Sequence, residues 1–546
     1  MRAAELFVQC IENEGAPFVF GVPGEENLDV MDALLDSKLR FVQTRHEQGA
    51  AFMADVQGRL TGKASVCLAT LGPGATNLVT GVSDAHLDRA PLVAVTGQAG
   101  INRLHKESHQ VLDLVALFRP LTKYSQQIVT PGIIPEVVRK AFKLAQTEKF
   151  GATHIDFPED IAKLPVEGVP LLAQQPYDAE PREEQLNRAA DLINGAQMPV
   201  IIAGNGVIRG NATEALRRFV AATNIPAANT FMAKGVVPYT DPRALLSVGL
   251  QAQDYVSYAI AQADVVVTIG YDLIEYPPER WNPNADKTIV HIDRQPAEVD
   301  SHYVLGCGIE ADLSITLDEL STLVEPRDVP TIVPKLRELI LDEQAQGGLL
   351  DGHPLAPQRV LHDVRAAMGA DDILISDVGA HKMWAARLYP CIEPNTCIIS
   401  NGFASMGIAL PGAIGAKLLF PERRVLALNG DGGFLMNSQE METAVRVGAN
   451  IVVLVWRDET FGLIKWKQIS QFGRPSHIDF GNPDFVQYAR SFGWAADRVD
   501  EASELAPALE AAFSAGKPAL IDVPIDASEN LKLTERLEAF EFAGGL

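Results

Sequence analysis

Paired cysteines are missing from this sequence. Its five cysteines form an odd set without a CxxC pair: Cys10, Cys67, Cys307, Cys391 and Cys397. A disulfide framework and a structural zinc site both need paired or closely spaced cysteines, so these two classes of protein are excluded. Free thiols persist where the surroundings are reducing, and we therefore expect a cytoplasmic protein.

Basic residues are scarce relative to acidic ones. The chain has 46 Lys and Arg against 70 Asp and Glu, a net charge of −24, which repels nucleic acid and anionic membranes alike. Long apolar runs are also missing, because none approaches the roughly 18 residues of a membrane span. Glu5 stands where a signal peptide would be apolar. We expect neither nucleic acid nor a membrane as a partner.

The length of 546 residues is too great for one hydrophobic core and favours about three domains. Two proline-rich stretches, at residues 158–181 and 326–334, are typical of linkers. A further interruption at 347–357 precedes the last block. The predicted domains are residues 1–165, 182–330 and 355–530.

Short apolar runs recur in all three blocks, and segments of helical periodicity follow them. They lie at residues 66–70, 200–203, 265–269, 425–428 and 451–455. Strands that are apolar on both faces are typical of parallel sheets covered by helices. We therefore predict an α/β fold with three domains, each a mostly parallel sheet covered by helices.

A glycine turn, Gly430-Asp431-Gly432-Gly433, follows one of these runs and opens a helix. Backbone N–H groups in such a turn can approach an anion, and a helix N-terminus adds partial positive charge, so the turn is a candidate diphosphate seat. Asp431 would repel phosphate unless a cation lay between them, and Mg²⁺ is the usual mediator. Alone, the motif is more often a structural turn.

The next apolar run, 451–455, leads into Trp456-Arg457-Asp458-Glu459-Thr460. Adjacent parallel strands end at the same edge of a sheet, so Asp458 can share a cation with Asp431. This arrangement resembles the thiamine-diphosphate motif, and the resemblance implies that Asp431, Asp458 and the carbonyl of Thr460 bind Mg²⁺. Asp458 stands where the motif commonly has Asn, but it remains an oxygen ligand.

Thiamine chemistry also needs a carboxylic acid beside the pyrimidine ring of the cofactor. Glu47, in the segment RHEQGAA at residues 45–51, is the candidate. Taken singly, a Glu in a first helical turn is more often a surface group favoured by the helix dipole. Together with the glycine turn and its partner strand, the segment resembles the acetolactate synthase branch of the thiamine-diphosphate enzymes, and the likeness extends over nearly the whole chain.

The resemblance implies a larger set of cofactor contacts. Beside Glu47, the cofactor-binding residues are expected to be Pro23, Gly24, Thr70, Gly74, Asn77, Gly379, His381, Met406, Gly430, Asp431, Gly432 and Gly433. The residue that matches Met406 wedges the cofactor into its bent form in that family. Ala380 replaces a common Gln and removes one contact.

Residues 108–124 and 269–282 resemble the catabolic, flavin-independent acetolactate synthases. The resemblance gives Gln110 a catalytic place facing the reacting carbonyls. It implies that one pyruvate loses CO2 and that its remaining two carbons join a second pyruvate to form 2-acetolactate. Lys467 stands where biosynthetic members carry a Trp that favours 2-oxobutyrate, with Trp466 one place earlier, which favours pyruvate as the acceptor.

Bound FAD is not expected, because residues 248–251 (VGLQ) replace the histidine-containing glycine segment of flavin-binding members. The segment 461–468 and the tail from Ser528 are candidate covers of the site. A 2-oxo-acid decarboxylase or related carboligase would share every cofactor residue and stays open as an alternative, as does, more remotely, a non-catalytic regulatory paralogue. The family places its site between subunits, so we expect a homodimer or homotetramer.

Overall fold

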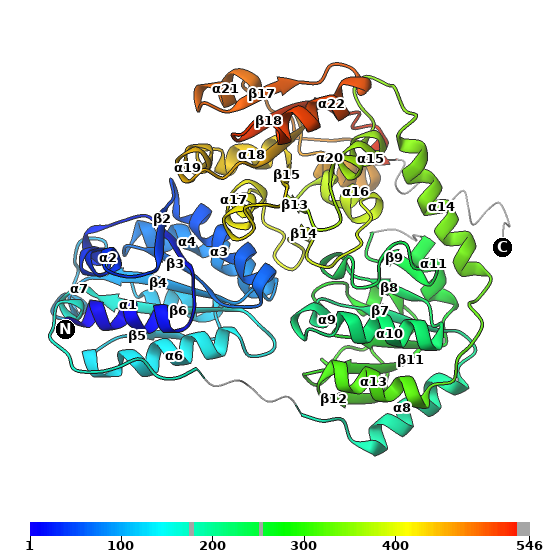
Figure 1. Ribbon diagram of the computed structural model, residues 1–546, viewed down its shortest axis with the longest axis horizontal. Coiled ribbons are helices and arrows are strands. Elements are labelled where there is room, and N and C mark those ends of the chain that lie inside the picture. Colours follow the sequence, from blue (N-terminus) through cyan, green and yellow to red (C-terminus); the bar gives the residue numbers. More distant parts are fainter. Residues whose placement is uncertain (174–178, 251–254, 532–546) are drawn as a thin grey trace.

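The computed structural model describes residues 1–173, 179–250 and 255–531, which form three α/β domains, each with a six-stranded sheet (Figure 1). The strand pairs within these sheets are parallel, and helices cover the sheets. The predicted fold class is confirmed. None of the helices within these ranges is long and apolar enough to cross a membrane.

The N-terminal sheet has the strand order β2-β1-β3-β4-β6-β5. Its strands are β1 (Phe18–Gly21), β2 (Arg40–Gln43), β3 (Ser65–Ala69), β4 (Leu92–Gln98), β5 (Ser125–Gln127) and β6 (Ala152–Pro158). Its helices are α1 (Ala3–Asn13), α2 (Leu28–Leu35), α3 (Glu47–Thr61), α4 (Pro73–Leu87), α5 (Leu114–Phe118), α6 (Ile134–Ala145) and α7 (Glu159–Ala162).

The central sheet has the order β12-β11-β10-β7-β8-β9. Its strands are β7 (Pro199–Ala203), β8 (Ala227–Asn229), β9 (Ala244–Ser247), β10 (Val265–Ile269), β11 (Thr288–Asp293) and β12 (Leu305–Glu310). The helices in this part of the chain are α8 (Glu183–Gly195), α9 (Gly206–Arg209), α10 (Thr213–Thr223), α11 (Tyr255–Gln262), α12 (Pro278–Trp281), α13 (Leu313–Leu323) and α14 (Ile332–Gly347).

The C-terminal sheet has the order β14-β13-β15-β16-β18-β17. Its strands are β13 (Ile373–Ser376), β14 (Cys397–Ile399), β15 (Val425–Gly430), β16 (Val452–Arg457), β17 (Ala495–Arg498) and β18 (Ala519–Pro524). Its helices are α15 (Pro357–Ala367), α16 (Ala380–Leu388), α17 (Ala409–Leu419), α18 (Asp431–Asn437), α19 (Glu440–Val447), α20 (Gly462–Phe472), α21 (Phe485–Ser491) and α22 (Ala502–Phe513).

The strand orders locate the places where ligands can bind. The N- and C-terminal sheets share one pattern, in which the first and third strands are neighbours and the chain leaves them in opposite directions. In the central sheet, the corresponding neighbours are β7 and β10. Open parallel sheets bind ligands beyond the carboxyl ends of the strands at such switch points. The fold therefore offers one candidate site per domain.

Helix α3 of the N-terminal domain packs on α17 of the C-terminal domain (Figure 1). Small residues allow this close approach, since a Cβ at Gly412 would lie 2.7 Å from Val56, and one at Gly415 would lie 2.8 Å from the carbonyl oxygen of Met53. The side chain of Gln57 donates to the carbonyl of Gly415 at 3.0 Å. The first and last domains are thus firmly joined within one chain, with the central domain beside them (Figure 1).

The four predicted boundaries between domains fall outside the helices and strands, whereas residue 530, the predicted end of the last domain, lies in a helical segment. Residue 165 follows α7, residue 182 precedes α8, residue 330 lies between α13 and α14, and residue 355 lies between α14 and α15.

Candidate active site

A cavity of about 260 Å³ lies at the switch point of the C-terminal sheet. All nine C-terminal residues that the sequence analysis selected line it: Gly379, His381, Met406, Gly430, Asp431, Gly432, Gly433, Asp458 and Thr460. Residues 461–464, at the start of α20, form part of its wall. The structure therefore brings this half of the predicted site together around one cavity.

The glycines of the turn are required by close packing. A Cβ at Gly430 would lie 3.0 Å from the ring of His381, and one at Gly433 would lie 2.4 Å from the carboxylate of Asp377. Strand β15 ends at Gly430 and helix α18 begins at Asp431, so the turn joins a buried strand directly to a helix N-terminus. Backbone N–H groups are thereby left close to the cavity, as anion binding requires.

Two carboxylates meet in the wall of the cavity. One oxygen of Asp431, Oδ2, accepts from the backbone N–H of Glu459 at 2.7 Å and of Asp458 at 3.2 Å. Its other oxygen, Oδ1, accepts from the N–H of Gly432 at 2.9 Å. Burial and the neighbouring Asp431 raise the pKa of Asp458 to about 7. Like charges held together in this way favour binding of a cation.

This candidate metal site depends on more than side chains. Within the described ranges, no group of three or more His, Cys, Asp or Glu is placed to hold a metal ion. Two carboxylates supply only part of the six oxygens that Mg²⁺ prefers, so a backbone carbonyl, water and ligand phosphate would supply the rest. That division is usual for Mg²⁺ sites that serve a phosphate ligand.

His381 places a buried ring nitrogen at the cavity. Burial lowers its pKa to about 3, so the imidazole is neutral, and its Nε2 is buried without a partner in the described structure. Asp377 organises the loops around it by accepting from the N–H of Val378 at 2.8 Å, the N–H of Gly407 at 2.7 Å and the amide of Asn429 at 3.0 Å. A buried orphan nitrogen beside a glycine turn fits a bound diphosphate.

The N-terminal half of the predicted site gathers at the switch point of its own sheet, after β1 and β3. Glu47 accepts from the amide of Asn77 at 2.9 Å. A Cβ at Gly74 would lie 3.3 Å from the Glu47 carboxylate and 2.9 Å from Thr70, and one at Gly24 would lie 2.4 Å from Thr70. Pro23 precedes Gly24. These residues form one compact cluster around the start of α3.

Gln110 lies beside this cluster. Its backbone carbonyl would be 2.8 Å from a Cβ at Gly72, the residue that begins the turn into α4. Gln110 has φ +59°, in the left-handed region. The loop is thus held against the glycine turn that carries Gly74.

The two halves do not meet in one chain. None of the seven N-terminal residues lines the cavity that the C-terminal residues share. Instead, Glu440 of α19 connects the C-terminal domain to the N-terminal domain of the same chain. Its carboxylate accepts from the N–H of Arg45 at 3.1 Å and of His46 at 3.0 Å, just before Glu47. A Cβ at Gly49 would lie 2.7 Å from this carboxylate.

Sequence reasoning missed Glu440 and Asn482. Glu440 is fully buried, and burial raises its pKa to about 7. Asn482 donates to Oδ2 of Asp431 at 2.9 Å. Neither residue lies in a glycine motif. The one available signal for Glu440 was an acid close behind the glycine turn, in a helix whose other buried residues are Met441, Thr443 and Ala444.

Helix α20 carries Trp466 and Lys467, the two residues from which pyruvate is expected as the acceptor. Trp466 is buried and Lys467 is exposed, and neither lines the cavity. Trp466 instead borders a separate cavity of about 240 Å³ together with Lys465 and residues 527, 528, 530 and 531. The predicted cover from Ser528 is therefore placed beside α20 as far as residue 531, and the remainder lies outside the described residues.

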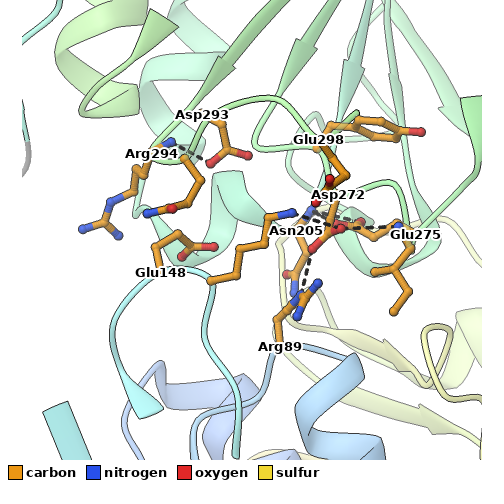
Figure 2. A network of polar contacts seen from close by, with 12 residues as sticks. Arg89, Glu148, Asn205, Asp272, Glu275, Asp293, Arg294 and Glu298 are labelled. Atoms are coloured by element: carbon orange, nitrogen blue, oxygen red, sulfur yellow. Dashed lines mark hydrogen bonds and ion pairs between the residues drawn. The ribbon is translucent and has the colours of Figure 1, made fainter. Parts of the chain in front are cut away.

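The switch point of the central sheet is filled by polar side chains. Figure 2 shows this network, in which Arg89 from the N-terminal domain donates to Asp272 at 2.7 Å. Lys149 pairs with Asp272 at 3.3 Å, and Arg209 donates to Glu148 at 2.5 Å. The carboxylate of Glu275 accepts from the N–H of Asn205 at 3.0 Å. Gln251, the last residue of the segment 248–251 that replaces the glycine segment of flavin-binding members, lies outside the described residues.

Three parallel-sheet domains, with a carboxylate-bearing glycine turn on a cavity in the last one, define an enzyme that binds a diphosphate cofactor. Family models agree in all three domains: the N-terminal thiamine pyrophosphate binding domain matches residues 1–117, the central domain of these enzymes matches 186–320, and the C-terminal thiamine pyrophosphate binding domain matches 377–523.

The chain belongs to the thiamine pyrophosphate enzymes and, within them, to the acetolactate synthase family. It is 36% identical to an acetolactate synthase of Bacillus subtilis, over 97% of this chain and 94% of that protein. It is 35% identical to a catabolic acetolactate synthase of Raoultella terrigena, over 98% and 97%. It is 33% identical to the large subunit of acetolactate synthase isozyme 1 of Escherichia coli, over 97% and 94%.

Proposed function

We propose that this protein is an acetolactate synthase, which decarboxylates pyruvate and condenses the remaining two carbons with a second pyruvate to give 2-acetolactate and CO2. The observation that carries the proposal is the single cavity lined by all nine C-terminal residues. Relatives that are acetolactate synthases over nearly the full chain support the same reaction. We further propose that the enzyme works in the cytoplasm.

The metal of this site is proposed to be Mg²⁺, with Asp431, Asp458 and the carbonyl of Thr460 as protein ligands. Support comes from two carboxylates at one wall and from Oδ1 of Asp431, which within the described part of the chain accepts only the N–H of Gly432. His381 and the N–H groups of residues 430–433 are proposed to bind the diphosphate. Bound thiamine diphosphate supplies a carbon nucleophile and an electron sink for the decarboxylation.

Glu47 is proposed to hold and transfer the proton on the pyrimidine side of the cofactor. Asn77 orients its carboxylate, and the small residues that follow it in α3 are buried. Gln110 is proposed to donate a hydrogen bond to a reacting carbonyl. Because this cluster and the cavity are separate in one chain, we propose a homodimer or homotetramer in which Glu47 of one subunit serves the cavity of another.

The proposed reaction proceeds without FAD. At the switch point of the central sheet, the loops Gly204-Asn205-Gly206 and Gly270 touch directly, since a Cβ at Gly206 would lie 2.6 Å from Cα of Gly270. The carboxylate of Glu275 takes the N–H of Asn205 that a phosphate would otherwise use. This packing supports a central domain that joins the other two and binds no dinucleotide there.

The test is a product analysis. Purified protein incubated with pyruvate, thiamine diphosphate and Mg²⁺, without added flavin, should form 2-acetolactate and CO2 in equal amounts. Acetaldehyde as the main product would instead identify a 2-oxo-acid decarboxylase. No turnover of any 2-oxo acid by folded protein would identify a non-catalytic relative.

A further inference from the structure

The segment 476–482 lies across the carboxylate wall of the diphosphate cavity. The carbonyl of Ile478 accepts from the N–H of Phe461 at 3.0 Å and from the hydroxyl of Thr460 at 3.2 Å. The N–H of Phe480 donates to the carbonyl of Glu459 at 3.2 Å. The segment is therefore fixed to the same loop that supplies the second carboxylate and the candidate carbonyl ligand.

The ring of Phe480 packs on that of Phe461, with centroids 5.0 Å apart. Both rings approach the glycine turn, because a Cβ at Gly432 would lie 3.0 Å from Phe461 and 3.2 Å from Phe480. The segment thus covers the turn with apolar rings, and it ends at Asn482, whose amide donates to Oδ2 of Asp431 at 2.9 Å.

This contact determines which oxygen of Asp431 is available. Oδ2 accepts from Asn482 and from two backbone N–H groups, whereas among the described residues Oδ1 accepts only from the adjacent Gly432. A hydrogen bond to a carboxylate is charge-assisted and strongly directional. Asn482 therefore helps to fix the orientation of the carboxylate through Oδ2, and Gly432 is the described donor to Oδ1.

A neutral amide is well suited to this place. Asp458 already adds a second carboxylate, and a further acid would increase the repulsion, whereas a Lys or Arg would compete with the metal for Asp431. An amide donates a hydrogen bond to the Asp431 carboxylate without carrying charge. The carbonyl oxygen Oδ1 of Asn482 is buried and has no partner in the described structure. Within the described residues, the Asn482 side chain therefore makes its hydrogen bond through the amide nitrogen.

We propose that Asn482 is a positioning residue of the metal site, which orients Asp431 to bind the cation through Oδ1. The inference rests on the metal site put forward above. Residues that orient metal ligands commonly contribute about 10–100-fold to metal affinity. It follows that Asn482 governs how tightly the protein holds the metal together with the diphosphate, while the chemical step is left to other residues.

The test is a calorimetric titration of Mg²⁺ into apo protein with saturating thiamine diphosphate. Asn482→Ala and Asn482→Leu both remove the amide, and Leu preserves most of the side-chain volume. The matched control is Gln468→Ala, because Gln468 holds the same segment at Ser476 through bonds of 2.8 and 3.2 Å and makes no hydrogen bond to Asp431 in the described structure. Unfolding midpoints of the apo proteins establish that each variant is folded.

We expect both Asn482 variants to bind Mg²⁺ at least about tenfold more weakly, the control to bind within a small factor of the native protein, and turnover of all three to recover at high Mg²⁺. Equal affinity of the native protein and the Asn482 variants would overturn the inference. An equal loss in Gln468→Ala would also overturn it, because the whole segment would then matter more than the amide. If the native protein itself showed no Mg²⁺ binding, the result would contradict the proposed metal site itself and, with it, the role of Asn482.

Discussion

At the switch point of the C-terminal sheet, Gly430 and Asp431 border a cavity of about 260 Å³, whereas at that of the central sheet, Gly204 and Gly206 lie directly against Gly270. Both places follow buried parallel strands and begin with glycine turns. The difference lies in the charges around them. Asp458 has the carboxylate of Asp431 as its main charged neighbour, while Asp272 pairs with Arg89 and Lys149 (Figure 2).

The pKa values follow that difference. Burial and Asp431 raise the pKa of Asp458 to about 7. Burial acts in the same direction on Asp272, yet Arg89 and Lys149 lower its pKa below the ordinary value. Parallel-sheet topology creates a candidate site at every switch point, and the local charge balance decides whether it holds a ligand or joins two domains.

The largest effect is expected from Asp431→Asn. This change removes the charge that we propose binds the cation, so bound cofactor and activity should fall by at least about a hundredfold. Cofactor retained after gel filtration and the initial rate with pyruvate measure it. Asp272→Asn is the matched control at the central edge: it should lower the unfolding midpoint and leave cofactor binding intact. Equal losses of bound cofactor and activity in Asp431→Asn and Asp272→Asn would contradict the difference between the two sites.

Glu47→Gln should lower turnover by about 100-fold or more, because general acid–base catalysis contributes effects of that size, while Mg²⁺ and cofactor binding persist. The cavity of one chain and Glu47 of another are proposed to form one site. Reassociated mixtures of Glu47→Gln and Asp431→Asn subunits should therefore recover activity, since each hybrid dimer has one intact site. Mixtures as inactive as either parent would place the whole site within one chain.

Glu275→Gln should change stability without changing catalysis. Burial raises the pKa of Glu275 from 4.5 to about 7. The folded state therefore keeps a proton that the unfolded state releases, so the stability from this group is full below pH 4.5 and is lost as the pH rises through 7. The unfolding free energy of the native protein relative to the variant should fall over this window by at most about 3 kcal/mol. Denaturant titrations at several pH values measure it, and a flat difference would contradict the assignment.

Much of the fold could be predicted because its strands are apolar on both faces and its switch points carry glycine. The runs at 265–269 and 425–428 lie in β10 and β15, and residues 430–433 lie at the turn into α18. Local patterns such as these depend on near neighbours in the chain, and they located the glycine turn at 430–433. The family resemblance supplied the others, such as Gly379, His381 and Met406, and these line the same cavity.

The contacts that cross domains could not be predicted in this way. Glu440 accepts from backbone groups almost 400 residues away, and backbone N–H groups carry no sequence signal. Asn482 reaches Asp431 from an irregular segment without periodicity. The ion pairs of Arg89 and Lys149 with Asp272 join charges that look like solvated surface groups when the sequence is read alone.

The smallest effect is expected from Lys467→Trp, which tests how much a residue on α20 changes the preference for the acceptor. A shift of one residue turns a helical side chain by about 100°, and the structure has Trp466 buried and Lys467 exposed on α20. A Trp at 467 therefore adds a ring on a new face of the helix without filling the cavity wall, which residues 461–464 form. In competition between pyruvate and 2-oxobutyrate as acceptors, the product ratio should move toward 2-oxobutyrate by less than about tenfold, the lower end of what one apolar contact gives.

Trp466→Leu is the control, because it removes a buried ring and should lower stability more than it alters the ratio. A larger change for Lys467→Trp would mean that α20 closes over the cavity during turnover, and an unchanged ratio would mean that the acceptor is chosen by residues elsewhere in the site.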